Sequence, residues 1–229
     1  MELLDQVPVE FNIEEVLKNL HIDGTLAEKL DVKKIHRTAI SLIRAKVLYT
    51  SVYINDRNGD MLDMGGAKLE SHVLAKNLEE VQRVFPYVIT IGNMLEDEVS
   101  RSQSVMTGLC LDNMGDLALH SAKTHLKKVL LEKHGLGNLS HISPGQLDWP
   151  LVQQKQLFSL FGDVESKIGV RLNDSYMMIP RKSISGIIFP TEVTFVSCQL
   201  CPRENCISRQ ADYSESVRKS YGLDPQFIP

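Results

Sequence analysis

The sequence lacks the features that mark secreted and membrane-spanning proteins. Only four of its 229 residues are cysteine, too few for a disulfide framework. No apolar run approaches the roughly 20 residues that a membrane-spanning helix requires. The first residues, MELLDQVPVEF, contain neither the basic nor the apolar region of a signal peptide. We therefore expect a cytoplasmic protein that does not enter a membrane.

The sequence also lacks an excess of positive charge. The chain has 25 lysine and arginine residues against 29 acidic residues, which gives a formal net charge of -4 and an isoelectric point near 6.0. The basic residues are scattered and form no stripe interleaved with aromatic residues, the pattern typical of nucleic-acid binding. We expect a soluble partner or a small ligand, and no nucleic acid.

The chain does contain enough apolar material for a core. Hydrophobic residues make up 43% of it, and no linker rich in proline, serine or glycine divides it. Helical and extended patterns are mixed along the chain, so we predict a single α+β domain over residues 1–196. In this interpretation residues 197–229 form a short C-terminal extension that contains cysteines.

Apolar spacing predicts the main elements of residues 1–133. Helices are expected from Asn12 to Leu20, from about Val32 to Val47, after Gly65-Gly66, and from about Gln103 to Lys133. The pair Asn58-Gly59 predicts a hairpin turn, and the run Phe85–Ile91 predicts a buried strand. The twin glycines match no phosphate-binding pattern, so we assign no nucleotide site to them.

The long helix carries a candidate binding residue. Gly108 and Gly115 cost stability within a helix, which indicates that another segment packs closely against it. Asp116 follows Gly115 among apolar neighbours. A partly buried carboxylate needs a partner, and either a cation on a ligand or an ordinary salt bridge would supply one.

The stretch from Leu139 to Phe189 is the most informative part of the sequence. Ser143-Pro144-Gly145 predicts a tight turn, after which Asp148 is a candidate cap for a short helix that ends near Gly162. A loop at the start of a helix presents backbone N–H groups that can receive a carboxylate; a plain turn is the alternative. Strands are expected at Ile168–Leu172 and Ser183–Phe189.

Three of the four cysteines are clustered. Cys198, Cys201 and Cys206 form a C-x2-C-x4-C array, whose thiolates suit zinc or three corners of an iron-sulfur cluster. The fourth ligand is left open among Cys110, a histidine, a water and a second chain. The alternative is that the three are reduced and bind nothing.

The segment IGVRLNDSYMMIPRKSISGIIF (168–189) resembles the activation domain of cobalamin-dependent methionine synthase. The resemblance consists of a Gly-containing strand, an acidic-Ser-aromatic-x-Met-x-Pro turn and a Ser-x-Ser-Gly strand, with the Ser-Pro-Gly loop at the expected distance upstream. GLCLDNMGDLALHSAKTHL is similar to the long helix of that family. The first hundred residues fit in outline only, as in stand-alone versions. The resemblance implies a twisted antiparallel sheet with several packed helices.

The resemblance also implies a function. In that family the domain binds S-adenosylmethionine and lies over the corrin of a cobalamin-binding domain. When cob(I)alamin is oxidised to cob(II)alamin, an electron from a reductase and a methyl group from S-adenosylmethionine regenerate methylcobalamin. The implied role is that of an activation module for a corrinoid-dependent methyltransferase such as methionine synthase. The implied partners are a corrinoid protein and an electron donor, and we assign no catalytic residue to the chain itself.

The residues implied for S-adenosylmethionine lie on the long helix and in the Ser-Pro-Gly loop. They are Asp116, His141, Ser143, Pro144, Gly145 and Gln146. The family has an arginine where this chain has His141, and a tyrosine where it has Gln146. An arginine binds a carboxylate through two parallel hydrogen bonds, whereas histidine is mostly neutral near pH 7.

Two other functions remain open at this point. The replaced loop residues and the added cysteines are compatible with a redox protein that feeds electrons to a corrinoid partner through a cluster at Cys198, Cys201 and Cys206, without S-adenosylmethionine. A binding protein that only protects the corrin is the third possibility.

Overall fold

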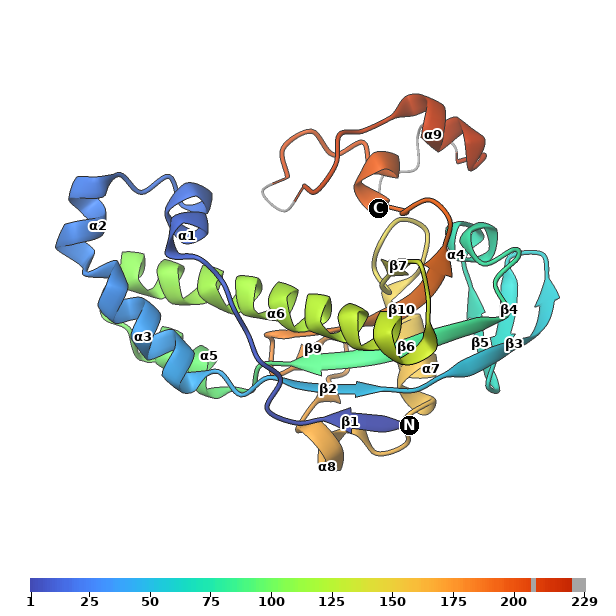
Figure 1. The fold of residues 1–229 in the computed structure, drawn as a ribbon, viewed down its shortest axis with the longest axis horizontal. Helices are drawn as coiled ribbons and strands as arrows, with labels where there is room; N and C mark the ends of the chain where they lie inside the picture. Colours follow the sequence, from blue (N-terminus) through green and yellow to red (C-terminus); the bar gives the residue numbers. More distant parts are fainter. Residues whose placement is uncertain (207–208, 224–229) are drawn as a thin grey trace.

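A curved antiparallel sheet forms the centre of the molecule. The computed structural model describes residues 1–206 and 209–223. The sheet runs in the order β1 (Glu2–Leu4), β2 (Lys46–Tyr49), β6 (Arg83–Thr90), β3 (Val52–Asn58), β4 (Met61–Met64) and β5 (Ala67–Glu70). On its other edge β6 pairs with β10 (Ser183–Thr191), which also pairs with β7 (Asn138–Ile142) (Figure 1). The predicted α+β class with an antiparallel sheet is confirmed.

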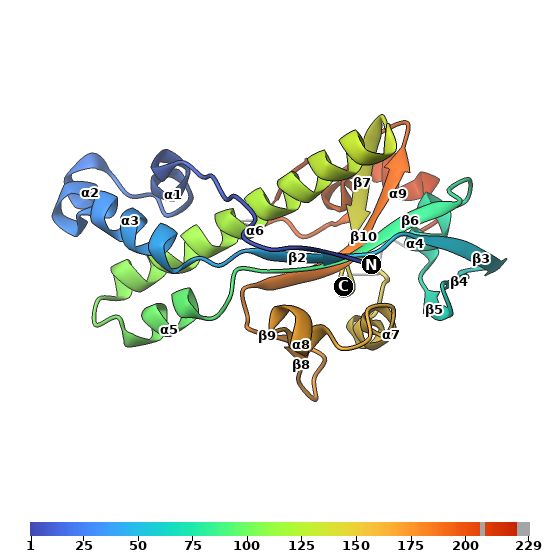
Figure 2. The same cartoon turned by 60° about the horizontal axis from the view of Figure 1, so that its bottom comes forward.

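Helices cover both faces of the central strands. The longest, α6 (Val105–His134), crosses one face, and α7 (Gln154–Ser159) and α8 (Val164–Ile168) lie on the other (Figure 2). Seven of the eight residues of β6 are buried, which explains why its sequence is a continuous apolar run. No helix in residues 1–206 and 209–223 is both long and apolar enough to cross a membrane.

The helices beside α6 are α1 (Ile13–Asn19), α2 (Gly24–Leu30), α3 (Val32–Leu42) and α5 (Met94–Arg101). Asn12 caps α1 as predicted, because its side chain accepts a hydrogen bond from Glu14 N at 3.0 Å. The helix predicted to reach Val47 ends at Leu42 instead. Val47 lies in β2, where it pairs with Ile89 and is fully buried.

The twin glycines form a hairpin turn, and the helix predicted to begin there is wrong. Gly65 and Gly66 have φ values of +64° and +89°, which reverse the chain between β4 and β5. The helix begins later, as α4 (His72–Asn77), with Ser71 as its cap. The hairpin predicted at Asn58-Gly59 is confirmed, since Asn58 pairs with Met61.

The strand predicted at Ile168–Leu172 is extended only in its last two residues, because Ile168 ends a helix. Asp163 Oδ1 accepts a hydrogen bond from Ser166 N at 2.9 Å and starts α8, which ends at Gly169 with φ of +75°. Only β8 (Arg171–Leu172) is extended, and it pairs with β9 (Met178–Ile179) in a separate two-stranded sheet.

Strand β5 lies at one edge of the sheet, and the side chain of Gln153 forms hydrogen bonds with its backbone. Gln153 lies in the 3₁₀ helix η1 (Leu151–Gln153). Its amide accepts from Glu70 N at 2.8 Å and donates to Glu70 O at 2.9 Å. The same oxygen of Gln153 accepts from the indole of the buried Trp149 at 3.1 Å. The loop before α7 is thus joined to the last strand.

The described part of the C-terminal segment packs on the domain. It contains η2 (Ser197–Leu200) and α9 (Glu215–Ser220), and it arches beside α4 and β7 (Figure 1). Leu200 is fully buried, and the Tyr221 hydroxyl donates to Asn77 Oδ1 at 3.1 Å. The boundary that we predicted after residue 196 stays a prediction.

Candidate ligand-binding site

The Ser-Pro-Gly loop crosses β10 at Gly186. A Cβ atom on Gly186 would lie 2.5 Å from the carbonyl oxygen of Ile142 and 2.7 Å from Ser143 Oγ. It would also lie 3.0 Å from the hydroxyl of Tyr87. Burial of this hydroxyl raises the pKa of Tyr87 to about 12. Only glycine permits so close a crossing, which gives a physical reason for the glycine of the Ser-x-Ser-Gly strand.

The two serines of that strand face away from α6 and have partners. Ser183 Oγ donates to Thr90 Oγ1 at 3.0 Å, and Ser185 Oγ donates to Gln154 Oε1 at 3.1 Å. The amide of Gln154 in turn donates to Tyr176 O at 2.8 Å. Ser185 therefore fastens α7, and through Gln154 the turn at Tyr176, to the sheet, whereas Ser183 joins β10 to β6.

The loop itself satisfies many of its own backbone groups. Gly145, with φ of +85°, donates from its N–H to Trp149 O at 2.8 Å. Gln146 N donates to Ser143 O at 3.1 Å, and Ser143 N donates to the side chain of Gln146 at 3.2 Å. These three N–H groups, which we expected to face a ligand, are used within the loop.

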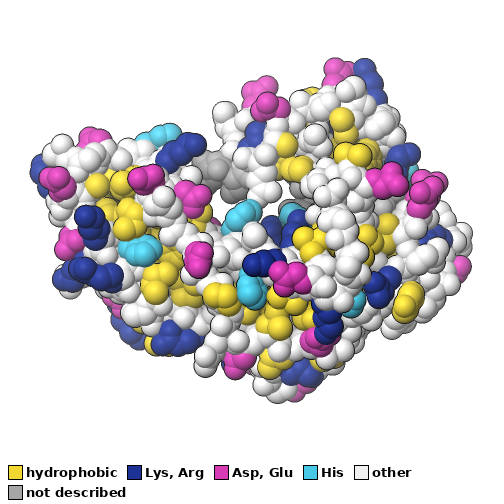
Figure 3. All heavy atoms as spheres, viewed as in Figure 1, with side chains coloured by type: hydrophobic (Ala, Val, Ile, Leu, Met, Phe, Trp, Pro, Cys, Tyr) yellow, Lys and Arg dark blue, Asp and Glu magenta, His cyan; other side chains and the backbone are white. Residues whose placement is uncertain are grey.

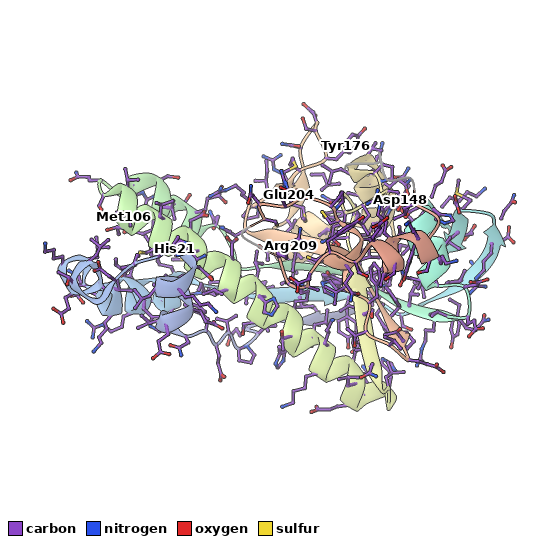
Figure 4. The ribbon with its side chains drawn as sticks, turned by 90° about the horizontal axis from the view of Figure 1, so that it is seen from above. His21, Met106, Asp148, Tyr176, Glu204 and Arg209 are labelled. Carbon is purple, nitrogen blue, oxygen red and sulfur yellow. The ribbon has the colours of Figure 1, made fainter. Side chains whose placement is uncertain are left out.

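Asp148 is not the cap of the helix that follows it. Its carboxylate accepts from Ser71 Oγ at 2.8 Å and from His72 N at 2.5 Å, at the start of α4. Figure 4 shows Asp148 on the side of the molecule where α4 lies. The prediction failed because this carboxylate meets the free N–H groups of a helix more than seventy residues earlier in the chain. The loop is thereby fixed to α4.

Asp116 has a protein partner. Lys182 Nζ lies 2.5 Å from Asp116 Oδ1 and 3.1 Å from Asp112 Oδ2. The side chain of Lys182 packs on Gly115, where an added Cβ would lie 3.2 Å from Lys182 Cε, so the close packing predicted at this glycine is confirmed. The Asp116 side chain is 60% exposed, which leaves it accessible to a ligand.

His141 lies on β7 and contacts a second lysine of α6. Its Nε2 atom is 2.9 Å from Lys123 Nζ. Burial, together with the neighbouring charges of Lys123 and Lys127, lowers the pKa of His141 to about 3. The imidazole is therefore neutral at physiological pH and accepts a hydrogen bond from the lysine.

The predicted ligand residues are not all brought into contact. Residues Ser143 to Gln146 form one loop directly after the strand that carries His141. Among the described residues no hydrogen bond or ion pair joins Asp116 to this loop or to His141. Figure 3 shows a hollow under the C-terminal segment, with histidine and basic side chains at its floor.

The cysteines lie in the C-terminal segment. Cys198 belongs to η2, Cys201 follows it, and all four cysteines are free thiols. The guanidinium of Arg209, labelled in Figure 4, donates to the carbonyl oxygens of Cys198 and Cys201 at 3.4 and 3.5 Å. Within residues 1–206 and 209–223 no three His, Cys, Asp or Glu side chains gather as metal ligands would. The predicted metal site stays a prediction without support here.

A long helix across a curved antiparallel sheet, with a Ser-Pro-Gly loop folded over a glycine of β10, defines a specific class of α+β domain. Residues 143–210 match the family model described as "Vitamin B12 dependent methionine synthase, activation domain". The resemblance to the activation domain of methionine synthase, found in the sequence, is thereby confirmed.

A solved structure supports the same fold. The chain is similar to the "Crystal Structure of the MetH Reactivation Domain bound to AdoHcy", with a TM-score of 0.56 and 13% sequence identity. The alignment covers 87% of this chain and 82% of that chain. At this identity the likeness establishes the fold alone. No curated protein matches the sequence.

Sequence reasoning missed Lys123 and Lys182, the two lysines that contact predicted site residues. Lys182 lies directly before β10, and its partner Asp116 on α6 is 66 residues away in the sequence. Lys123 lies seven residues after Asp116, and residues at that spacing share one helix face. The helical period could have identified Lys123, whereas its partner on β7 depends on the fold.

Proposed function

We propose that the protein is an activation module for a corrinoid-dependent methyltransferase, with methionine synthase as the first candidate. The observation that carries the proposal is the family match over residues 143–210, which contains both the Ser-Pro-Gly loop and strand β10. The fold of the reactivation domain over 87% of the chain supports it. The partners in this proposal are a corrinoid-binding protein and an electron donor.

The chemistry belongs to the ligand and to the partner's corrin. In the proposed reaction one electron would reduce cob(II)alamin to cob(I)alamin, whose cobalt would attack the methyl carbon of S-adenosylmethionine while the bond from that carbon to the sulfonium sulfur breaks. The products are methylcobalamin and S-adenosylhomocysteine. A domain that holds the methyl donor above the cobalt makes this step effectively unimolecular and traps the reduced metal. The reactivation domain of similar fold is described as bound to AdoHcy, the product of this transfer.

The residues of this chain would bind S-adenosylmethionine by its charged amino-acid end. In the proposal Asp116, which is exposed and faces solvent beside Lys182, attracts the ammonium group of the ligand. Ser143 forms the wall at Gly186, and Pro144 and Gly145 would continue the site from it. Because three N–H groups of the loop are already used, shape and side-chain charge contribute more than the loop backbone.

A reconstitution experiment tests the function. The purified protein is mixed with the cobalamin-binding part of methionine synthase in the cob(II)alamin form, a chemical reductant and S-adenosylmethionine labelled on its methyl group. We expect the absorption spectrum of methylcobalamin to appear and the label to be bound to the corrin. Control mixtures omit the protein or the reductant. No transfer of label, together with no complex between the proteins, would contradict the proposal.

The alternative redox function is not supported by the described residues, because no metal-ligand cluster is found there. The assignment of zinc or an iron-sulfur cluster to Cys198, Cys201 and Cys206 is kept as a separate prediction. Metal analysis and visible absorption of anaerobically purified protein decide it. Stoichiometric zinc or iron that is lost on replacement of Cys201 by serine is the supporting result.

A further inference from the structure

Two lysines of α6 point their ammonium groups toward β7. Lys123 Nζ lies 2.9 Å from His141 Nε2, and Lys127 Nζ donates to Leu139 O at 3.1 Å. Both lysines are half-buried, and they lie about two and three turns beyond Asp116 along the same helix. A second charged position therefore exists on the α6 side of the sheet, about 10 Å along the helix from Asp116 at 1.5 Å per residue.

This pair of cations has no counter-charge in the described part of the chain. No Asp or Glu oxygen there lies within ion-pair distance of Lys123 or Lys127, whereas the buried Lys182 pairs with both Asp112 and Asp116 on α6. The titratable groups near the two lysines are His120 on α6 and Glu15 on α1. The charge of Glu15 raises the pKa of His120, against burial and the charges of Lys123 and Lys127, which lower it. Partly desolvated charges without partners are costly, so the position favours an incoming anion.

The electrostatics of the neighbouring groups agree with this reading. Burial and the charge of Lys127 lower the pKa of Lys123 to about 8, and burial lowers the pKa of Lys127. Lys123 is still protonated in most molecules at pH 7. Its hydrogen bond to neutral His141 uses one of its three N–H groups, which leaves two for a ligand.

His141 is itself incompletely satisfied. Its Nδ1 atom is buried and has no hydrogen-bond partner among the residues that the structure describes. Because Nε2 accepts a hydrogen bond from Lys123, the proton of the neutral ring is on Nδ1. This Nδ1–H group has no acceptor among the described residues. Lys123 and His141 together thus present unused donors directly before the loop at Ser143.

We propose that Lys123 is the residue that binds the carboxylate of the methyl donor, so that a lysine on α6 supplies the positive charge that the related domains carry on the loop itself. The inference rests on the proposed function. His141 occupies the loop position at which the family has an arginine, and it orients Lys123 by accepting from it. Asp116 and Lys123 would then receive the two charges of the amino-acid end of the ligand.

Calorimetry with two ligands tests the proposal. S-adenosylhomocysteine carries the amino-acid end, and 5′-methylthioadenosine lacks it. We expect Lys123→Met to weaken binding of S-adenosylhomocysteine about 10- to 100-fold, the loss expected for a charge-assisted hydrogen bond. Binding of methylthioadenosine should change by less than about twofold. Lys123→Arg, which keeps the charge, should retain most of the affinity.

Lys128→Met is the matched control, because Lys128 is on the same helix, is 72% exposed in its side chain and pairs with Glu132 at 4.0 Å. It should leave both affinities unchanged. If the natural protein binds S-adenosylhomocysteine and Lys123→Met binds it equally well with its melting temperature intact, the carboxylate lies elsewhere and only this inference fails. If the natural protein binds neither ligand, the proposed function fails and this inference with it.

Discussion

Single residues determine how closely the loop, β10 and β6 approach one another. The nearest atoms to a Cβ at Gly186 belong to the backbone of Ile142 and to two hydroxyl groups, one of them on the buried Tyr87. Backbone atoms of a strand that is hydrogen-bonded to its neighbour cannot withdraw as the end of a flexible side chain can. The identity of residue 186 is therefore set by packing, whether or not a ligand binds.

Gly186→Ala tests this packing argument. The added methyl group would overlap Ile142 O, so we expect the free energy of unfolding to fall by about 1 to 3 kcal/mol. Denaturant unfolding monitored by Trp149, the single tryptophan, measures it. Gly137→Ala is the control, because a Cβ there meets nothing within 4 Å. An equal effect of the two substitutions would show that Gly186 is not under steric constraint.

At the scale of elements, one histidine joins α4 to the C-terminal segment. His72 Nδ1 lies 2.8 Å from Asp60 Oδ1, and His72 Nε2 lies 2.7 Å from Tyr221 O. Both neighbours are acceptors, so only the doubly protonated ring donates to both. The hydrogen bond to Asp60 raises the pKa of His72, with burial opposing it and the Tyr221 carbonyl adding to it.

The stability that this raised pKa supplies depends on pH. It is fully present below the pKa of histidine in the unfolded chain and is lost as pH rises through the higher pKa of the folded protein. We expect hydrogen exchange in α9 to become faster, relative to α6, when the pH is raised across that interval. The effect is moderate because the His72 side chain is 43% exposed.

His72→Gln should remove the pH dependence of exchange in α9 while α6 keeps its protection. His125, which lies on α6, is the position for a control substitution to glutamine. A pH dependence that persists in His72→Gln would mean that another group controls the attachment of α9.

The elements also show which parts of the fold the sequence could determine. The long helix and the central strands were predictable, because thirty residues of helical spacing or a continuous apolar run leave little ambiguity. Val47, Leu69 and Ile168 were assigned wrongly, because short apolar runs fit a helix and a strand equally well. Pairing with distant strands or a glycine with positive φ decided those cases.

The candidate site likewise contains features that the local sequence predicts and contacts that depend on the fold. The loop and Asp116 were located from local sequence and from the family resemblance. The contacts of Lys182 with Asp116 and of Lys123 with His141 span 66 and 18 residues. Such pairs follow from sheet order and from the direction in which α6 crosses the strands, neither of which is encoded in residue spacing alone.

At the scale of the whole molecule, the C-terminal segment shares a core with the rest of the domain. Leu200 is buried in the cluster that also contains Trp149, Phe189 and Phe195. The predicted boundary after residue 196 would make residues 197–229 an appendage. The shared core suggests instead that the described part of this segment unfolds together with the sheet.

Leu200→Ala distinguishes these possibilities. Loss of a buried leucine side chain should lower the free energy of unfolding by about 2 to 5 kcal/mol, and the whole transition seen by Trp149 fluorescence should shift. Val193→Ala is the control, since Val193 is 81% exposed. An unchanged Trp149 transition in Leu200→Ala would favour an extension that unfolds independently.

The amide of Gln153 has a consequence for how molecules meet one another. It presents a carbonyl and an N–H to Glu70 with the spacing of a neighbouring strand, and so occupies the outer hydrogen-bonding groups of β5 at that residue. Unpaired edge strands recruit edges from other copies and start aggregates. The side chain of Gln153 covers this edge at Glu70, so two copies of the protein cannot pair through the backbone of β5 at this residue.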